Sequence, residues 1–206
     1  MTILDRLFLL VTGLIALYLI WYFGKKHKET KCVCNIYFLV SFLVLLISGL
    51  LLIFLGWDVL GKDLVAVIAS LIPFSLAVGL IARFYKKSYV AYLVLMIIGL
   101  VLIAVARLGG MTSLARVVYP LFHAIAGLTI FFVPIFAVSA KKAKSSYIFV
   151  TIGGALIGLG GIALAFLKSG KQFLFFSQSL VMTILAPLLF LMTFFFAIGF
   201  VKGEEQ

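Results

Sequence analysis

A single histidine, His123, stands inside a long apolar run beside residues that could bind a ligand. Arg116, Tyr119, His123 and Gly127 share one face of a helix, because residues three and four apart are neighbours on a helix surface. A polar residue held inside hydrocarbon is costly unless it is paired, so it is the first place to look for function in a membrane protein. A cation, a phenol and an imidazole in this order suit a polar headgroup, a quinone carbonyl or a metal-bound cofactor.

The competing interpretation of His123 is structural. A neutral imidazole can hydrogen-bond a carbonyl or hydroxyl group on a neighbouring helix and bind no ligand. The sequence does not identify a cofactor, and a bis-histidine haem would need a second imidazole, which only a symmetric dimer would supply. The helix is expected to begin after Arg116, so that Pro120 falls in its tolerant first turn and His123 lies about 9 Å along the axis.

A second polar face is expected in the last apolar run, at residues 173–201. Ser179 and Thr183 precede Pro187 at intervals of four residues, and Pro187 removes the hydrogen bond to the Thr183 carbonyl. Pro73 and Pro134 predict kinks in two further helices. The hydroxyls could line a pore or ligand pocket, or they could satisfy a packed kink.

Both cysteines and the other histidine lie in one basic segment, where His27, Cys32 and Cys34 offer three soft metal ligands. A closed zinc site needs four ligands, and C-x-C departs from the usual spacing, so no metal site is expected. The alternative is a solvated basic loop that faces a reducing cytoplasm, where disulfides are not expected. Its lysines would attract anionic lipid headgroups.

A stripe of small residues predicts close helix packing in the sixth apolar run. Gly154, Gly158 and Gly161 share a face, and close approach of two backbones is the usual role of such a face in a membrane helix. The contact could be made within the chain or with a second protomer. The sequence also suggests a loose internal repeat, because residues 46–53 resemble residues 96–103.

Enzymatic chemistry is not expected. Proton transfer, nucleophilic attack or metal-assisted hydrolysis would need several His, Glu, Asp, Cys or Lys residues at one depth, and no apolar run contains a second such residue near its middle. The net charge of +11 could suggest nucleic acid, but the basic residues are dispersed over helix ends and do not form one binding element.

The apolar runs that carry these residues define an all-α membrane protein. Of 206 residues, 66% are hydrophobic and 11% charged, well outside the range of soluble domains. A helix needs about 20 apolar residues to span a bilayer. Seven runs of this kind form a single domain over residues 1–206, near 7–23, 36–56, 64–83, 89–106, 117–139, 147–167 and 173–201.

Short connections between the runs predict three hairpins and a closing helix. Eleven of the seventeen Lys and Arg residues lie after the first, third and fifth runs or in the C-terminal tail, which predicts an outside N-terminus and an inside C-terminus in the cell membrane. Rhodopsins share this topology, but retinal proteins need a buried lysine in the last helix, and residues 173–201 contain no charged residue.

Two functions from different classes remain open. The first is a non-catalytic integral subunit or scaffold of a membrane complex, which binds partner helices or a second copy, membrane lipid or a quinone-like molecule near His123. The second is a small facilitator or transporter for an apolar or weakly polar solute, in which the helices with prolines move. The lack of buried coupling charges favours the first.

Overall fold

The computed structural model describes residues 1–168 and 177–203, without the side chains of residues 163–168, 178 and 179. Within these residues the chain forms seven helices that are long and apolar enough to span a membrane, which confirms the expected all-helical, multi-pass class. They are α1 (Ile3–Thr30), α2 (Val33–Leu55), α3 (Asp63–Phe84), α4 (Tyr89–Leu108), α5 (Thr112–Ser139), α6 (Ile148–Lys168) and α7 (Gln178–Gly203). The short helices η1 (Trp57–Gly61) and η2 (Ser145–Tyr147) lie in two connections.

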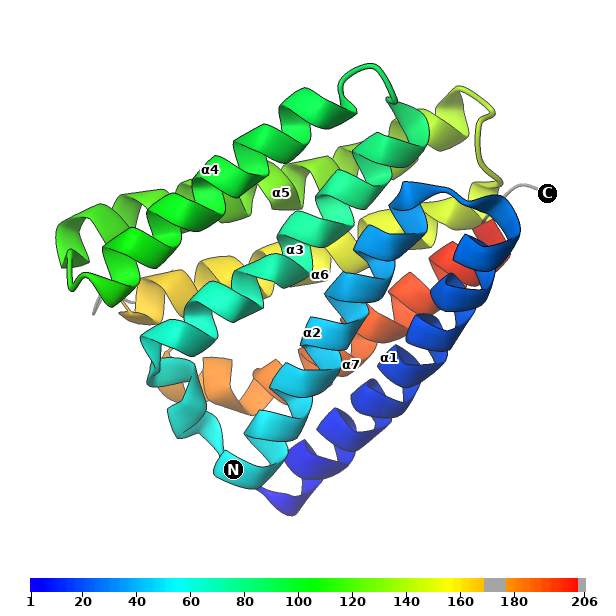
Figure 1. Cartoon of the computed structure of the whole chain (residues 1–206). Coiled ribbons are helices and arrows are strands. Elements are labelled where there is room, and N and C mark those ends of the chain that lie inside the picture. Colours follow the sequence, from blue (N-terminus) through cyan, green and yellow to red (C-terminus); the bar gives the residue numbers. More distant parts are fainter. Residues whose placement is uncertain (169–176, 204–206) are drawn as a thin grey trace.

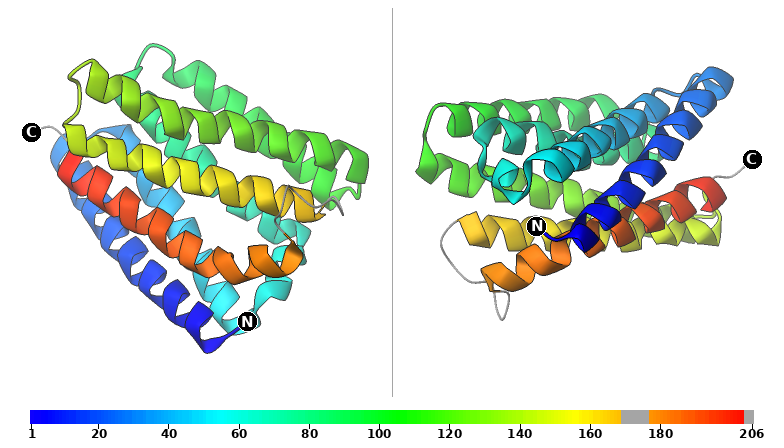
Figure 2. Two further views of the ribbon diagram at one scale, coloured as in Figure 1. Left: turned by 180° about the vertical axis from the view of Figure 1, so that it is seen from behind. Right: turned by 90° about the horizontal axis from the view of Figure 1, so that it is seen from below.

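The helices form a closed ring in chain order. Each helix packs against the next one, α7 packs against α1, and α3 also packs against α5. Figure 1 shows α3 running through the middle of the bundle, and α3 is the most buried of the seven helices while α4 is the least buried. The views in Figure 2 show α1 and α7 side by side, which closes the ring. The neighbours of α3 are thus α2, α4 and α5.

The first helix is longer than its apolar run because both of its ends are capped. The Thr2 hydroxyl accepts a hydrogen bond from the Asp5 amide, and the Asp5 carboxylate accepts one from the Thr2 amide, at 3.1 and 2.7 Å. At the other end, Lys31 ends α1 in the left-handed conformation with φ 54°. The basic segment expected to be a loop is therefore mostly the last turns of α1.

The cysteines also differ from expectation, since Cys32 and Cys34 are joined in a disulfide. Cys32 is the N-cap of α2, where its sulfur accepts a hydrogen bond from the Cys34 amide at 3.3 Å. His27 approaches the Cys32 carbonyl through Nδ1 at 3.0 Å. Both sulfurs and the imidazole are thus engaged in the turn between α1 and α2.

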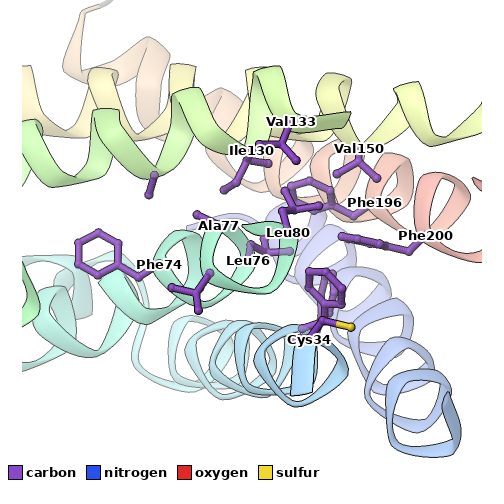
Figure 3. Packing of buried hydrophobic residues seen from close by; sticks show 14 of the residues in the cluster. Cys34, Phe74, Leu76, Ala77, Leu80, Ile130, Val133, Val150, Phe196 and Phe200 are labelled. Atoms are coloured by element: carbon purple, nitrogen blue, oxygen red, sulfur yellow. The ribbon is translucent and has the colours of Figure 1, made fainter. Parts of the chain in front are cut away.

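The half of the bundle at the lysine-rich end, where α1 ends and α2 begins, is filled by aromatic side chains. Phe23, Phe38, Phe42, Phe196 and Phe200 are fully buried there, with ring centroids 4.7 to 6.2 Å apart where they meet. Figure 3 shows Phe196 and Phe200 of α7 lying between α2, α3 and α6, close to Leu80 and Val150. This end of the bundle is closed by apolar packing.

The fifth and sixth helices approach closely at two of the three predicted glycines. A Cβ at Gly154 would lie 2.8 Å from Ile130 of α5, and one at Gly161 would overlap the His123 ring. By contrast, a Cβ at Gly158 would meet no described atom within 4 Å. The expected continuous contact through Gly158 is therefore corrected: α6 leans on α5 at Gly154 and Gly161, with a gap between them.

Candidate functional site

A cavity of about 140 Å³ lies at the centre of the bundle, next to Pro73 of α3. We call it the central cavity, and six helices and η1 contribute to its wall. Most of the wall is apolar, and its polar side chains among the described residues are Thr12, Ser48, Tyr119 and His123. A dry apolar cavity of about 150 Å³ can hold benzene or xenon, so the volume suits one small apolar group.

His123 projects into this cavity from the middle of α5. The helix begins at Thr112 and not after Arg116, so His123 lies about 16 Å along the axis, deeper than the sequence suggested. Pro120 is correspondingly inside the helix and not in its first turn. The change follows from the tight Gly109–Gly110 turn, in which Gly110 has φ 68° and allows α5 to start early.

The imidazole of His123 is buried, and its two nitrogens are its only polar atoms. Both ring nitrogens are shielded from solvent, and neither has a hydrogen-bond partner among the residues that the structure describes. The ring rests on Gly161, and the backbone of Ile157 lies beside it. Pro73 adds a second open group, because a proline at this position gives the Ala69 carbonyl no N–H partner. The cavity wall therefore contains hydrogen-bonding groups, above all the two His123 nitrogens, that the described neighbours do not pair.

Tyr119 lies between the central cavity and a second hollow, at the end of the bundle where α3 and α5 begin and α4 ends. Its ring stacks on His123 with centroids 5.9 Å apart, and the Arg107 guanidinium lies 5.3 Å from the ring centroid. The phenol also contacts the Ser70 hydroxyl, which donates to the Ala66 carbonyl at 2.9 Å. Tyr119 therefore contacts both a cation and an imidazole.

The second hollow, which we call the vestibule, has a volume of about 250 Å³. Arg107, Arg116 and Asp63 lie in its wall, and Leu60, Ala69 and Tyr119 belong to both hollows. Arg107 Nη1 lies 3.5 Å from the Asp63 carboxylate. Its Nε is buried and has no hydrogen-bond partner within the described part of the chain. The vestibule and the central cavity are adjacent, and together they run from the bundle end to His123.

The structure brings together Arg116, Tyr119 and His123, but it places the predicted residues of α7 elsewhere. Thr183 has an exposed side chain and does not line the central cavity. The side chain of Ser179 lies outside the described part of the chain. Pro187 is inside α7 and Pro134 inside α5, but neither lines the cavity, whereas Pro73 does.

Sequence reasoning missed Thr12, Ser48 and Arg107. Thr12 and Ser48 are isolated hydroxyls in apolar runs, and only the ring arrangement of helices turns them toward His123. Arg107 ends α4, a helix that faces mostly outward, and its meeting with Tyr119 requires the α4–α5 hairpin to close. The position of Arg107 just before a Gly-Gly turn was the available signal, because such a turn returns the chain beside the helix end.

Comparison with known proteins gives no relative, since no family model, curated protein or solved structure matches the chain. The geometry must therefore carry the functional argument. Among the described residues there is no group of three or more His, Cys, Asp or Glu side chains that could hold a metal ion. The site is an apolar space with an imidazole at its wall whose two nitrogens are open to a hydrogen bond. Such a space is suited to binding a small molecule.

Proposed function

We propose that the protein is a non-catalytic integral membrane subunit or scaffold that holds a small, mostly apolar molecule in the central cavity. The observation that carries this proposal is the pair of buried His123 nitrogens without described partners at the wall of an apolar space. A buried polar group without a hydrogen bond costs about 1–3 kcal/mol, and a ligand with one polar atom would remove that cost. A quinone carbonyl or a phenol has this chemistry.

The proposal includes an orientation and a membrane. The N-terminus lies outside and the C-terminus inside the cell, because most lysines and arginines flank the opposite end of the bundle. The vestibule then opens to the outside. Helix partners, in the form of other subunits or a second copy, would cover the apolar outer faces, and α4 is the helix with the smallest buried share.

Two fluorinated probes of benzene size test the binding proposal. In phosphatidylcholine nanodiscs, fluorine NMR should show saturable binding of 4-fluorophenol and about 2- to 10-fold weaker binding of fluorobenzene, which lacks the hydroxyl. His123→Leu should abolish this difference by weakening 4-fluorophenol alone. Empty nanodiscs give the partition of each probe into lipid, which is subtracted.

Gly49→Leu should fill part of the cavity, because Gly49 lines it and a Cβ there meets no described atom within 4 Å. This variant should lose both probes. Gly158→Leu is the matched control, since its surroundings are equally open and it does not line the cavity. Unchanged binding in Gly49→Leu would overturn the proposal.

A facilitator of weakly polar solutes is the second candidate, and it is supported by the adjacency of the vestibule and the central cavity. The aromatic cluster at the lysine-rich end argues against it, because a path would have to pass Phe38, Phe42 and Phe196. Stopped-flow glycerol uptake into liposomes should show no acceleration by the purified protein. A faster flux that Gly49→Leu removes would favour the facilitator.

A further inference from the structure

We propose that the ligand is an amphiphilic acid, whose anionic group binds Arg107 and Arg116 in the vestibule while its apolar part passes Tyr119 into the central cavity. This inference rests on the proposed function and names the chemical class of the molecule bound. The anionic group is a carboxylate or a phosphate, and the apolar part is about as large as benzene or a short alkyl chain.

The charge of the vestibule favours an anion. Two guanidinium groups face it and one carboxylate, Asp63, opposes them. The Arg107 side chain is only 18% exposed, and its single ion pair is long, at 3.5 Å, to an Asp63 side chain that is 52% exposed. A pair of this kind contributes little, so Asp63 leaves much of the capacity of Arg107 unused.

The donor inventory of Arg107 points the same way. A guanidinium has five N–H donors in a planar fork that matches a carboxylate or phosphate. Its Nε is buried with no partner among the described residues, beside the face of Tyr119. An anion that accepts from this nitrogen would satisfy a buried donor, and Arg116 is exposed in the same wall, where it adds a second positive charge.

The apolar part follows from the position of Tyr119. The tyrosine belongs to the walls of both hollows, and beyond it the wall changes from charged residues to leucines and glycines around His123. A molecule with its charge at Arg107 would therefore place its tail in the central cavity. A free anion would fill only the vestibule, and an uncharged apolar molecule only the cavity.

The probe pair 6-fluorohexanoate and 6-fluorohexanol tests the inference, because the two differ in the charged group alone. In phosphatidylcholine nanodiscs, fluorine NMR should show hexanoate binding at least about tenfold more tightly than hexanol, and higher salt should weaken hexanoate only. Arg107→Gln and Arg116→Gln should each weaken hexanoate about tenfold and leave hexanol unchanged. Arg6→Gln is the matched control, since Arg6 is exposed at the same end but does not line the vestibule.

Asp63→Asn provides a gain of function that a folding defect cannot imitate. Removing the competing carboxylate should tighten hexanoate binding several-fold. Equal affinity of hexanoate and hexanol, both lost in Gly49→Leu, would overturn the inference and leave the proposed function standing. Retention of both probes in Gly49→Leu would overturn both.

Inorganic phosphate and acetate form the last arm. If either anion competes at millimolar concentration as effectively as unlabelled hexanoate does, that result would show that the vestibule binds free anions without a tail, and it would overturn the inference. Weak competition by both, with strong competition by hexyl phosphate, would support an amphiphile and admit a phosphate in place of the carboxylate.

Discussion

The proposed function rests on His123, whose buried imidazole has no hydrogen-bond partner among the described residues. Its ring packs against Gly161 and Tyr119, and both contacts could be made by an apolar side chain. The two nitrogens add only a desolvation cost in the empty protein.

Replacing His123 by leucine should therefore raise the stability of the ligand-free protein, by about 1–3 kcal/mol, because two unsatisfied buried atoms are removed. His123→Gln should give no gain, since its amide would also lack a described partner. Thermal unfolding in detergent, monitored by circular dichroism, measures both variants. A clear loss of stability in His123→Leu would mean that the imidazole does bond to α6, as the structural interpretation requires.

Among the helices, α6 shows how small residues set the spacing of the bundle. Gly154 and Gly161 face α5, while Gly153 and Gly160 face α7, where Cβ atoms would lie 2.6 Å from Phe196 and 3.1 Å from Leu188. Glycines one residue apart thus allow α6 to fit tightly between two neighbours. The Thr151 hydroxyl donates a hydrogen bond of 2.9 Å to the Phe131 carbonyl of α5.

This arrangement predicts opposite effects of the same change at two glycines. Gly154→Ala should destabilise by about 1–3 kcal/mol, because its Cβ would press on the Ile130 side chain and backbone. Gly158→Ala should stabilise the protein by about 0.5–1 kcal/mol, because the added Cβ meets no described atom and alanine is the better helix former. Thermal unfolding under identical detergent conditions compares the two. Equal effects would show that the contact with Ile130 does not limit the packing of α6.

At the scale of the whole molecule, the two ends of the bundle differ in packing and charge. The lysine-rich end is filled by phenylalanines, whereas the other end is hollow and carries two arginines around the vestibule. The disulfide between Cys32 and Cys34 lies at the lysine-rich end, which the charge bias assigns to a reducing cytoplasm. These two indications of sidedness conflict, so orientation needs a direct test.

Single cysteines introduced at each end should report the orientation. In a Cys32→Ser, Cys34→Ser background, Ser113→Cys lies at the vestibule end and Ser88→Cys at the lysine-rich end, and both positions are exposed. If the basic residues set the topology, a membrane-impermeant maleimide should label Cys at 113 in intact cells and Cys at 88 only after permeabilisation. The reverse pattern would invert the bundle and place the vestibule inside.

The sequence by itself determined the class, the number of spans and the approximate position of each helix. Hydropathy is a sum over local residues, and a bilayer requires every span to satisfy its own backbone hydrogen bonds, so this information is local. It also identified His123 and its helical neighbours Tyr119 and Arg116, because periodicity on one helix is local too. Helix ends were less accurate, since caps such as Thr2 and the turn at Gly110 extend α1 and α5 beyond their apolar runs.

Only the tertiary structure decided which faces meet. Thr12, Ser48 and Arg107 reach the site from three other helices, and Thr183 is turned away from it, because the ring closure and crossing of the helices set their rotation. Gly154 and Gly158 look alike in sequence, yet one presses on Ile130 and the other faces a gap. Contacts between distant segments depend on packing between helices, which no pattern within a single helix contains.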